Sequence, residues 1–279
     1  MNNSRRKLMD YDKAAEVAQG IYWVGYNDKE NGLHSNPYLI YEGDEGVLID
    51  GGSRPDFSSV MMKVLMTGIL PDQIVRLIYQ HYDPDLVGSV SNFESIISNN
   101  ELEIISQKQN NIFIQHYSTT SKLVCINKIR NSWGFRTGRR LKFINTPYTH
   151  SPGSFVTYDE QTKTLFSSDI FGAYGKHWDL FMDVSEKCSE CSSYDDCPIG
   201  RDTCFMPGII RFHQIIMTSN LALRKTLDKC RELDIELIAP QHGSLIRGAE
   251  QVKVIIDKLY DITDIGIDGI EANGEDHIW

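Results

Sequence analysis

Long apolar runs are missing from this 279-residue sequence, and so is an excess of positive charge. No run approaches the ~18 apolar residues of a membrane-spanning helix, so we expect no membrane partner. Lysine and arginine number 28 against 38 acidic residues, and the net charge of −10 argues against nucleic acid as a partner. No apolar segment of a signal peptide follows the basic residues near the N-terminus. We therefore expect a cytoplasmic protein.

Cysteine is also scarce, with six residues. Because disulfides are rare in the cytoplasm, six cysteines indicate metal or redox chemistry instead of a disulfide framework. Hydrophobic residues make up 41% of the chain and charged residues 24%, which is ordinary for a globular protein with a sizeable core. We find no short internal repeat and no interior linker, so we predict a single domain over residues 1–279.

Strand and helix patterns alternate along most of the chain. They predict an α/β fold of the αββα sandwich type, in which two mixed sheets are flanked by helices. Residues 171–208 differ, because they are rich in Asp, Ser, Gly and Cys without a clear period, and a loop of that length is usually functional. Residues 264–279 form an acidic tail. The predicted strands are 20–26, 37–41, 46–52, 71–79, 101–106, 123–128, 140–147, 154–158, 164–168 and 235–240, and the predicted helices are 56–66, 84–97, 112–117, 212–233 and 248–262.

Potential metal ligands follow four separate predicted strands. A strand that ends in clustered imidazoles and carboxylates directs several ligands into one small space, where a cation relieves the repulsion between the carboxylates. Asp83 before Pro84 can alternatively be a helix cap, but the matching residues later in the chain favour a metal site. Two further histidines, His34 and His213, receive no ligand assignment. The candidate ligands are His81, Asp83 and Asp85 in the first loop, His150 in the second, Asp169 in the third and His242 in the fourth.

The order and spacing of these residues resemble the metallo-β-lactamase fold, in its branch of flavodiiron and oxygen-binding di-iron proteins. Between Asp85 and His150 there are 64 residues, between His150 and Asp169 there are 18, and between Asp169 and His242 there are 72. The segments His-Ser-Pro-Gly-Ser-Phe-Val-Thr-Tyr-Asp and Leu-Phe-Ser-Ser-Asp-Ile-Phe-Gly carry the resemblance most specifically. It implies that His81, Asp83 and His150 bind one metal, that Asp85 and His242 bind a second, and that Asp169 bridges them.

Two positions depart from the pattern of that branch. Leu86 stands where a second histidine is common, which leaves an open position at one metal, and Asp83 stands where glutamate is common. Carboxylates without thiolates, together with open positions, favour two irons and oxygen chemistry over zinc and hydrolysis. Zinc also accepts carboxylates, so a dinuclear zinc hydrolase stays an alternative.

Four cysteines lie in the insertion at about 171–208. Cys188, Cys191, Cys197 and Cys204 are spaced as C-x2-C-x5-C-x6-C within 17 residues. One C-x2-C pair with wider, uneven spacing suits a 4Fe–4S cluster, while structural zinc, which more often uses two such pairs, is the alternative. The resemblance does not explain this insertion.

The sequence contains no segment that resembles a flavodoxin domain, so we expect no FMN in this chain. We therefore expect a protein that binds or senses oxygen or a redox signal at its di-iron centre, coupled to the iron–sulfur cluster, in signalling. The alternative is an oxidoreductase that reduces O2, NO or peroxide with electrons from a separate protein. The expected partners are O2 or another diatomic ligand and a signalling or electron-transfer protein, and the resemblance implies a homodimer.

Overall fold

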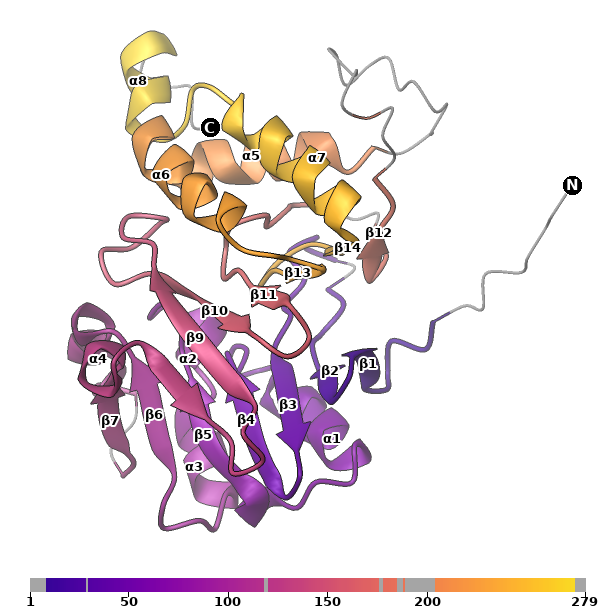
Figure 1. Cartoon of the computed structure of the whole chain (residues 1–279), viewed down its shortest axis with the longest axis vertical. Helices are drawn as coiled ribbons and strands as arrows, with labels where there is room; N and C mark the ends of the chain where they lie inside the picture. The colour runs from indigo at the N-terminus through magenta and orange to yellow at the C-terminus, as the bar shows by residue number, and fades with distance from the viewer. Residues whose placement is uncertain are drawn as a thin grey trace, which may run out of the picture.

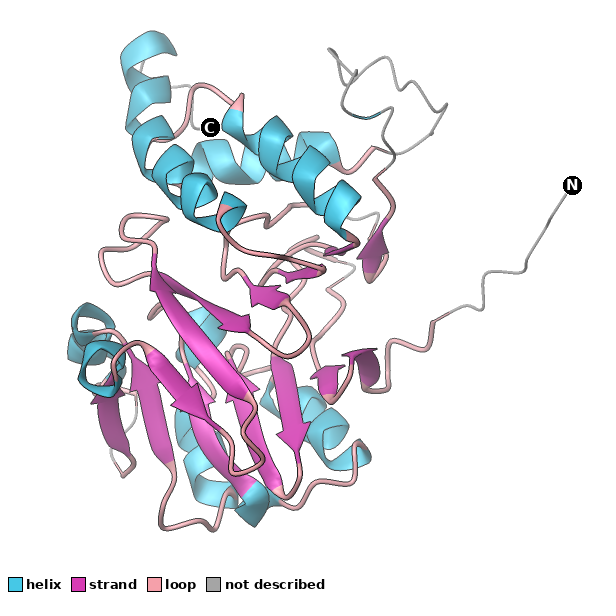
Figure 2. Ribbon diagram, viewed as in Figure 1, coloured by secondary structure: helices cyan, strands magenta, loops and turns pink. Residues whose placement is uncertain are grey.

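The structure is a computed structural model that describes residues 9–28, 30–117, 120–175, 178–184, 188 and 204–273. Within these residues, two seven-stranded sheets pack face to face, and helices cover both outer faces (Figure 1; Figure 2). This four-layer arrangement confirms the predicted αββα sandwich.

The first sheet has the order β1-β2-β3-β4-β5-β6-β7. Neighbours are antiparallel from β1 to β4 and parallel from β4 to β7. The strand predicted over 71–79 is shorter than expected, because its first residues form a 3₁₀ turn, η1 (Pro71–Gln73). The strands are β1 (Ala15–Ala18), β2 (Ile21–Trp23), β3 (Tyr38–Glu42), β4 (Glu45–Ile49), β5 (Ile74–Ile78), β6 (Glu103–Ser106) and β7 (Lys122–Cys125), and η2 (Ile126–Ile129) follows them.

The second sheet has the order β12-β14-β13-β11-β10-β9-β8. The strands predicted over 154–158 and 164–168 correspond to β10 and β11, which pair as an antiparallel hairpin, while β11 and β13 pair in parallel. The strands are β8 (Ser132–Gly134), β9 (Arg140–Asn145), β10 (Phe155–Asp159), β11 (Thr164–Phe166), β12 (Phe181–Met182), β13 (Leu237–Ala239) and β14 (Leu245–Arg247).

The buried apolar residues form three hydrophobic cores, one between the two sheets and one under the helices on each outer face. Side chains alternate along each strand and therefore enter two of these cores in turn. In β4, Val47 and Ile49 face the second sheet, whereas Leu48 between them faces the outer helices. Val156 of β10 likewise faces the helices that cover the second sheet, and its neighbour Phe155 faces the first sheet. Because the side-chain period of a strand is two, each central strand contributes to two cores at once.

Helices near the N-terminal half cover the first sheet, and the C-terminal helices gather on the second (Figure 1). The single helix predicted over 84–97 is two helices, α2 and α3. The helix predicted over 212–233 is also two, because the Ser219 hydroxyl accepts a hydrogen bond from the backbone of Ala222 and starts a new helix. The helices are α1 (Phe57–Met66), α2 (Pro84–Val87), α3 (Val90–Ile96), α4 (Lys108–Ile114), α5 (Met206–Ile216), α6 (Asn220–Arg231), α7 (Ala249–Tyr260) and α8 (Ile267–Asn273).

The predicted insertion and the predicted acidic tail both contain regular structure. Strand β12 lies inside the predicted insertion at 171–208 and pairs in parallel with β14, and α8 lies inside the predicted tail at 264–279. None of the helices in the described part of the chain has the length and apolar character needed to span a membrane.

A buried ionic cluster joins the two sheets at the end of the sandwich. The guanidinium of Arg139 donates two hydrogen bonds to Asp159, at 2.9 and 2.8 Å, and a third to Glu42 at 3.0 Å. The side chains of Arg139 and Asp159 are completely buried. Such a pair tolerates joint replacement better than loss of one partner, because a lone buried charge has nothing to compensate it.

We therefore expect Arg139→Met to lower the free energy of unfolding by about 3–5 kcal/mol, as measured by urea denaturation. Arg140→Ala is the matched control, because Arg140 pairs with Glu160 at the surface, where the two side chains are 63% and 50% exposed. Its loss is expected to cost at most about 1 kcal/mol. Equal destabilisation by the two variants would contradict this reading of the cluster.

Candidate metal centre

The loops that carry the candidate ligands are tied together by backbone hydrogen bonds where the strands end. The N–H of Phe155 in the second sheet donates to the carbonyl of Gln80, which follows β5 in the first sheet, at 3.2 Å. The N–H of Gln241 donates to the carbonyl of Ser168 at 2.8 Å. Gln80, Ser168 and Gln241 each lie next to a candidate ligand, and Phe155 closes the loop that carries His150, so the two sheets bring the ligand loops to one edge of the sandwich.

Asp169 lies at the centre of the predicted ligand set. Its Oδ2 atom is 2.9 Å from Nε2 of His150 and 3.7 Å from Nε2 of His81, and its Oδ1 atom is 3.8 Å from Nε2 of His242. The two carboxylate oxygens therefore face different histidines. This is the arrangement that a carboxylate bridging two cations requires.

The two remaining carboxylates divide between the two sides of Asp169. Oδ2 of Asp83 is 3.3 Å from Nε2 of His150 and 4.0 Å from Nε2 of His81. Oδ2 of Asp85 is 2.9 Å from Nε2 of His242. The structure thus brings all six predicted side chains together, and the ligand atoms of Asp85 also lie within 4.8 Å of those of His81 and Asp83.

Two of the donor atoms that would face a cation lack other partners. Nε2 of His81 and Oδ1 of Asp169 are both buried, and neither has a hydrogen-bond partner among the described residues. A buried polar atom without a partner costs free energy, which a bound cation would remove. Ligand atoms of His81, His150 and Asp169 all lie within 4.8 Å of one another. Imidazole nitrogens with carboxylate oxygens form a donor set that suits iron or zinc, so the residues fit a metal pair.

Hydrogen bonds behind the histidines orient their rings. The carbonyl of His34 accepts a hydrogen bond from Nδ1–H of His242 at 2.8 Å, which leaves Nε2 of the neutral ring free to bind a metal. Nδ1 of His81 lies 2.9 Å from the hydroxyl of Ser168, and in the corresponding tautomer Nδ1–H donates to that oxygen. Such outer partners are typical of metal-binding histidines.

Electrostatics within this cluster shift several pKa values strongly. Burial by itself lowers the pKa of His150, but hydrogen bonds with Asp169 and Asp83 outweigh it and raise the pKa to about 10. Burial is likewise outweighed at His242, where Asp85 and Asp169 raise the pKa to about 9. The three histidines hold the pKa of Asp169 well below its usual range despite its burial. Without a cation the cluster holds protons in its place, as metal sites do.

Nothing in the sequence indicated that Asn36 would support the site. Its side-chain amide donates to the carbonyls of Pro240 and Gly243, at 3.0 and 2.8 Å, and so bridges the turn that carries His242. The indole N–H of Trp23 in turn donates to the side-chain amide oxygen of Asn36, Oδ1, at 2.8 Å. Asn36 lies 204 and 207 residues from Pro240 and Gly243, and it binds their backbone carbonyls, which leave no pattern in the sequence.

Leu86, at the position where a further histidine is common in the resembled branch, is completely buried. It belongs to the apolar cluster between the first sheet and its helices. The cysteine prediction falls largely outside the described residues, which include Cys188 and Cys204 but not Cys191 and Cys197. Cys188 and Cys204 are half-buried, and Cys188 packs against the apolar core under the C-terminal helices.

Residues 33–243 match the family model described as "ODP family beta lactamase". The chain belongs to this family. Two solved structures of the chemotaxis sensor ODP, one of its peroxy diiron species and one of its apo state from T. denticola, are each 26% identical to this chain. Each matches with a TM-score of 0.72 over 93% of this chain and 97% of that protein.

Longer relatives of this ODP-family chain are also similar to it. An uncharacterized protein of Methanocaldococcus jannaschii is 28% identical over 87% of this chain and 59% of its own length. The anaerobic nitric oxide reductase flavorubredoxin of an Enterobacter species is 30% identical over 64% of this chain and 39% of its own length. The chain therefore spans about two fifths to three fifths of the length of these curated relatives.

Proposed function

We propose that this ODP-family chain binds or senses oxygen, or a related redox signal, at a di-iron centre. In this proposal His81, Asp83 and His150 hold one iron, Asp85 and His242 hold the other, and Asp169 bridges them. The observation that carries the proposal is the placement of the two Asp169 oxygens toward different histidines. The similarity to the chemotaxis sensor ODP over nearly the whole length of that protein supports it.

A pair of irons supplies electrons and coordination positions for a diatomic gas. The chain's own residues decide how that gas reaches the centre. His81, Asp169 and His242 are almost completely buried, whereas Asp83 and Asp85 are 34% and 36% exposed. The solvent side of the site is therefore the side of the two aspartates, and we infer that gas enters there. Leu86 lies in the apolar cluster and offers no further ligand, so the iron held by Asp85 and His242 would keep an open position.

We further propose that the four cysteines bind a 4Fe–4S cluster, coupled to the di-iron centre, and that the pair serves in signalling to a partner protein. Zinc at the cysteines is the alternative. The C-x2-C-x5-C-x6-C spacing supports a bound metal or cluster. A homodimer is expected, and light scattering of the purified protein measures it directly.

Anaerobic purification, followed by quantification of iron, zinc and acid-labile sulfide, tests the metal assignment. Irons of an iron–sulfur cluster are accompanied by an equal amount of sulfide. After these are subtracted, we expect about two irons per chain from the di-iron centre. Adding O2 to the reduced protein is then expected to produce a new visible absorption band from the di-iron centre. Absence of that band in a protein loaded with iron would refute oxygen binding.

The same preparation separates two alternatives. Similarity to nitric oxide reductase flavorubredoxins favours a reductase of O2, NO or peroxide as the second candidate. Sustained consumption of gas or peroxide with a reduced flavoprotein or rubredoxin would support that activity. Zinc alone, with turnover of an ester or thioester, would instead support the hydrolase.

A further inference from the structure

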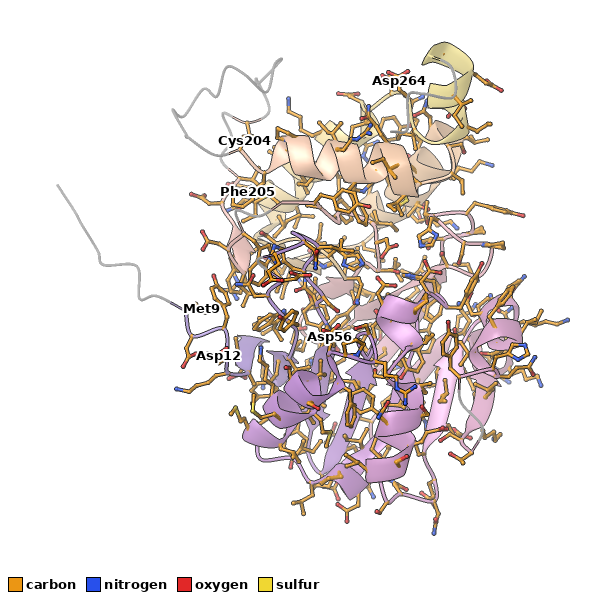
Figure 3. All side chains as sticks on the ribbon, turned by 180° about the vertical axis from the view of Figure 1, so that it is seen from behind. Met9, Asp12, Asp56, Cys204, Phe205 and Asp264 are labelled. Carbon is orange, nitrogen blue, oxygen red and sulfur yellow. The ribbon has the colours of Figure 1, made fainter. Side chains whose placement is uncertain are left out.

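Helix α5 joins the cysteine segment to the loop that carries Asp169. It begins at Met206, two residues after Cys204, and Figure 3 shows Cys204 and Phe205 together at its beginning. Phe205 packs against the apolar core under the C-terminal helices. Any displacement of the chain at Cys204 therefore acts directly on the first turn of α5.

The first turn of α5 is fixed against the segment that follows Asp169. The N–H of Tyr174 donates to the carbonyl of Gly208 at 3.3 Å. A side chain at position 208 would overlap the carbonyl oxygen of Tyr174, so the helix and the segment pack backbone against backbone. Glycine permits this close approach, and the contact leaves little room for α5 to move without moving residues 172–175.

Farther along α5, His213 binds the Asp169 loop itself. The N–H of Phe171 donates to Nε2 of His213 at 3.1 Å, and Nδ1–H of His213 donates to the carbonyl of Ile209 at 2.7 Å. Because a backbone N–H can only donate, the ring must be neutral and carry its proton on Nδ1. The ring is completely buried, and burial lowers the pKa of His213 to about 4, which keeps it neutral.

Phe171, whose N–H binds His213, lies two positions after Asp169. Phe171 has a φ of +70°, in the left-handed region that a non-glycine residue adopts only when its surroundings impose it. Next to His213 on the same helix, the Phe212 ring lies 5.7 Å, centroid to centroid, from His242. One rigid element therefore contacts the surroundings of both sides of the metal centre.

We propose that α5 couples the cysteine segment to the metal centre and that His213 is the positioning residue through which it acts on Asp169. The proposal rests on the proposed function in that the His/Asp cluster binds metal. It does not depend on whether the cysteines hold a cluster or zinc, or on whether the gas is oxygen.

Affinity of the His/Asp centre for Co²⁺ tests the coupling in the full chain after chelation. Co²⁺ bound to imidazole and carboxylate absorbs differently from Co²⁺ bound to thiolate, so binding at this centre can be followed separately. We expect His213→Leu to weaken Co²⁺ binding by about 10–100-fold, as loss of an outer partner does. We expect Cys204→Ser to weaken it by about tenfold through α5.

The double variant decides whether the two effects share one route. If α5 transmits both, His213→Leu with Cys204→Ser binds Co²⁺ no more than about threefold more weakly than His213→Leu alone. Effects that multiply, or an unchanged affinity in Cys204→Ser, would overturn the coupling. These outcomes are distinct from failure of the proposed function. That failure would appear as a purified protein without iron, or as an iron-loaded protein in which O2 produces no new absorption band.

Two control variants separate the hydrogen bond of His213 from its packing. His213→Gln places an amide oxygen where Nε2 accepts from Phe171, so we expect affinity within about threefold of the unmodified protein. Ile209→Val trims the same buried face of α5 and leaves that hydrogen bond intact, with the same expected result. If His213→Gln binds Co²⁺ as weakly as His213→Leu, the role of His213 is packing alone and the positioning role is wrong.

Discussion

Asp169→Asn is expected to abolish binding of both metals while the chain stays folded. The Asp169 carboxylate presents one oxygen to His81 and His150 and the other to His242, so both proposed metals lose an anionic ligand at once. An asparagine side chain has the same shape, but its amide nitrogen cannot bind a cation and the side chain carries no charge. We expect affinity for iron to fall by more than the ~100-fold that loss of an outer partner costs.

A comparison of single aspartate variants sharpens this prediction. Asp85 contacts His242 alone among the ligand histidines, so Asp85→Asn is expected to lose about one metal per chain and Asp169→Asn about two. Asp234→Asn is the matched control, because Asp234 is exposed and pairs with Lys163 away from the centre. Metal content is measured after equilibration with Fe²⁺ without oxygen. Two firmly bound metals in Asp169→Asn would rule out a bridging role.

The second large effect is expected in the pH dependence of metal binding. The metal-free cluster raises the pKa of His150 to about 10 and that of His242 to about 9, so both rings are protonated at neutral pH. A metal ion must displace those protons, because only the neutral ring is a ligand. Below pH 9 we expect the affinity for each metal to rise by up to about tenfold for each pH unit, with about one proton released per metal and about two per pair.

Calorimetric titration in buffers with different ionisation enthalpies measures the number of protons released. Asp50 needs a control of its own, because burial raises its pKa to about 8, within the same pH range. Asp50 donates no ligand in the proposal, so Asp50→Asn should leave the proton count at about two. A metal affinity that does not change between pH 6 and 8.5 would contradict protonation of the two histidines.

The same shifts predict the opposite trend for the stability of the metal-free protein. The pKa values of His150 and His242 in the folded state exceed the ordinary value of 6.5 expected after unfolding. Their contribution to stability is therefore complete below pH 6.5 and is lost as the pH rises toward about 9 and 10. Metal binding and metal-free stability thus change in opposite directions with pH.

Hydrophobic periodicity allowed most of the architecture to be predicted. Continuous apolar runs such as Val47-Leu48-Ile49 indicate strands buried between two apolar layers, and turns between them separate the elements. The prediction was wrong where a local stop signal was missed, as at Ser219 between α5 and α6. It also missed β1, β8, β12 and β14, which are only two to four residues long and lie in no longer strand pattern.

The sequence by itself determined which residue types follow which strands, since three histidines and three aspartates stand immediately after predicted strands and keep a family spacing. Only the tertiary structure decided that Asp169 lies between two groups of ligands, and that Asn36, Ser168 and His213 support them. The physical reason is that ligand identity is a local property of the chain, whereas a hydrogen bond to a distant backbone group depends on how the two sheets pack. Backbone carbonyls and N–H groups are the same in every residue, so their partners emerge only when the fold brings them together.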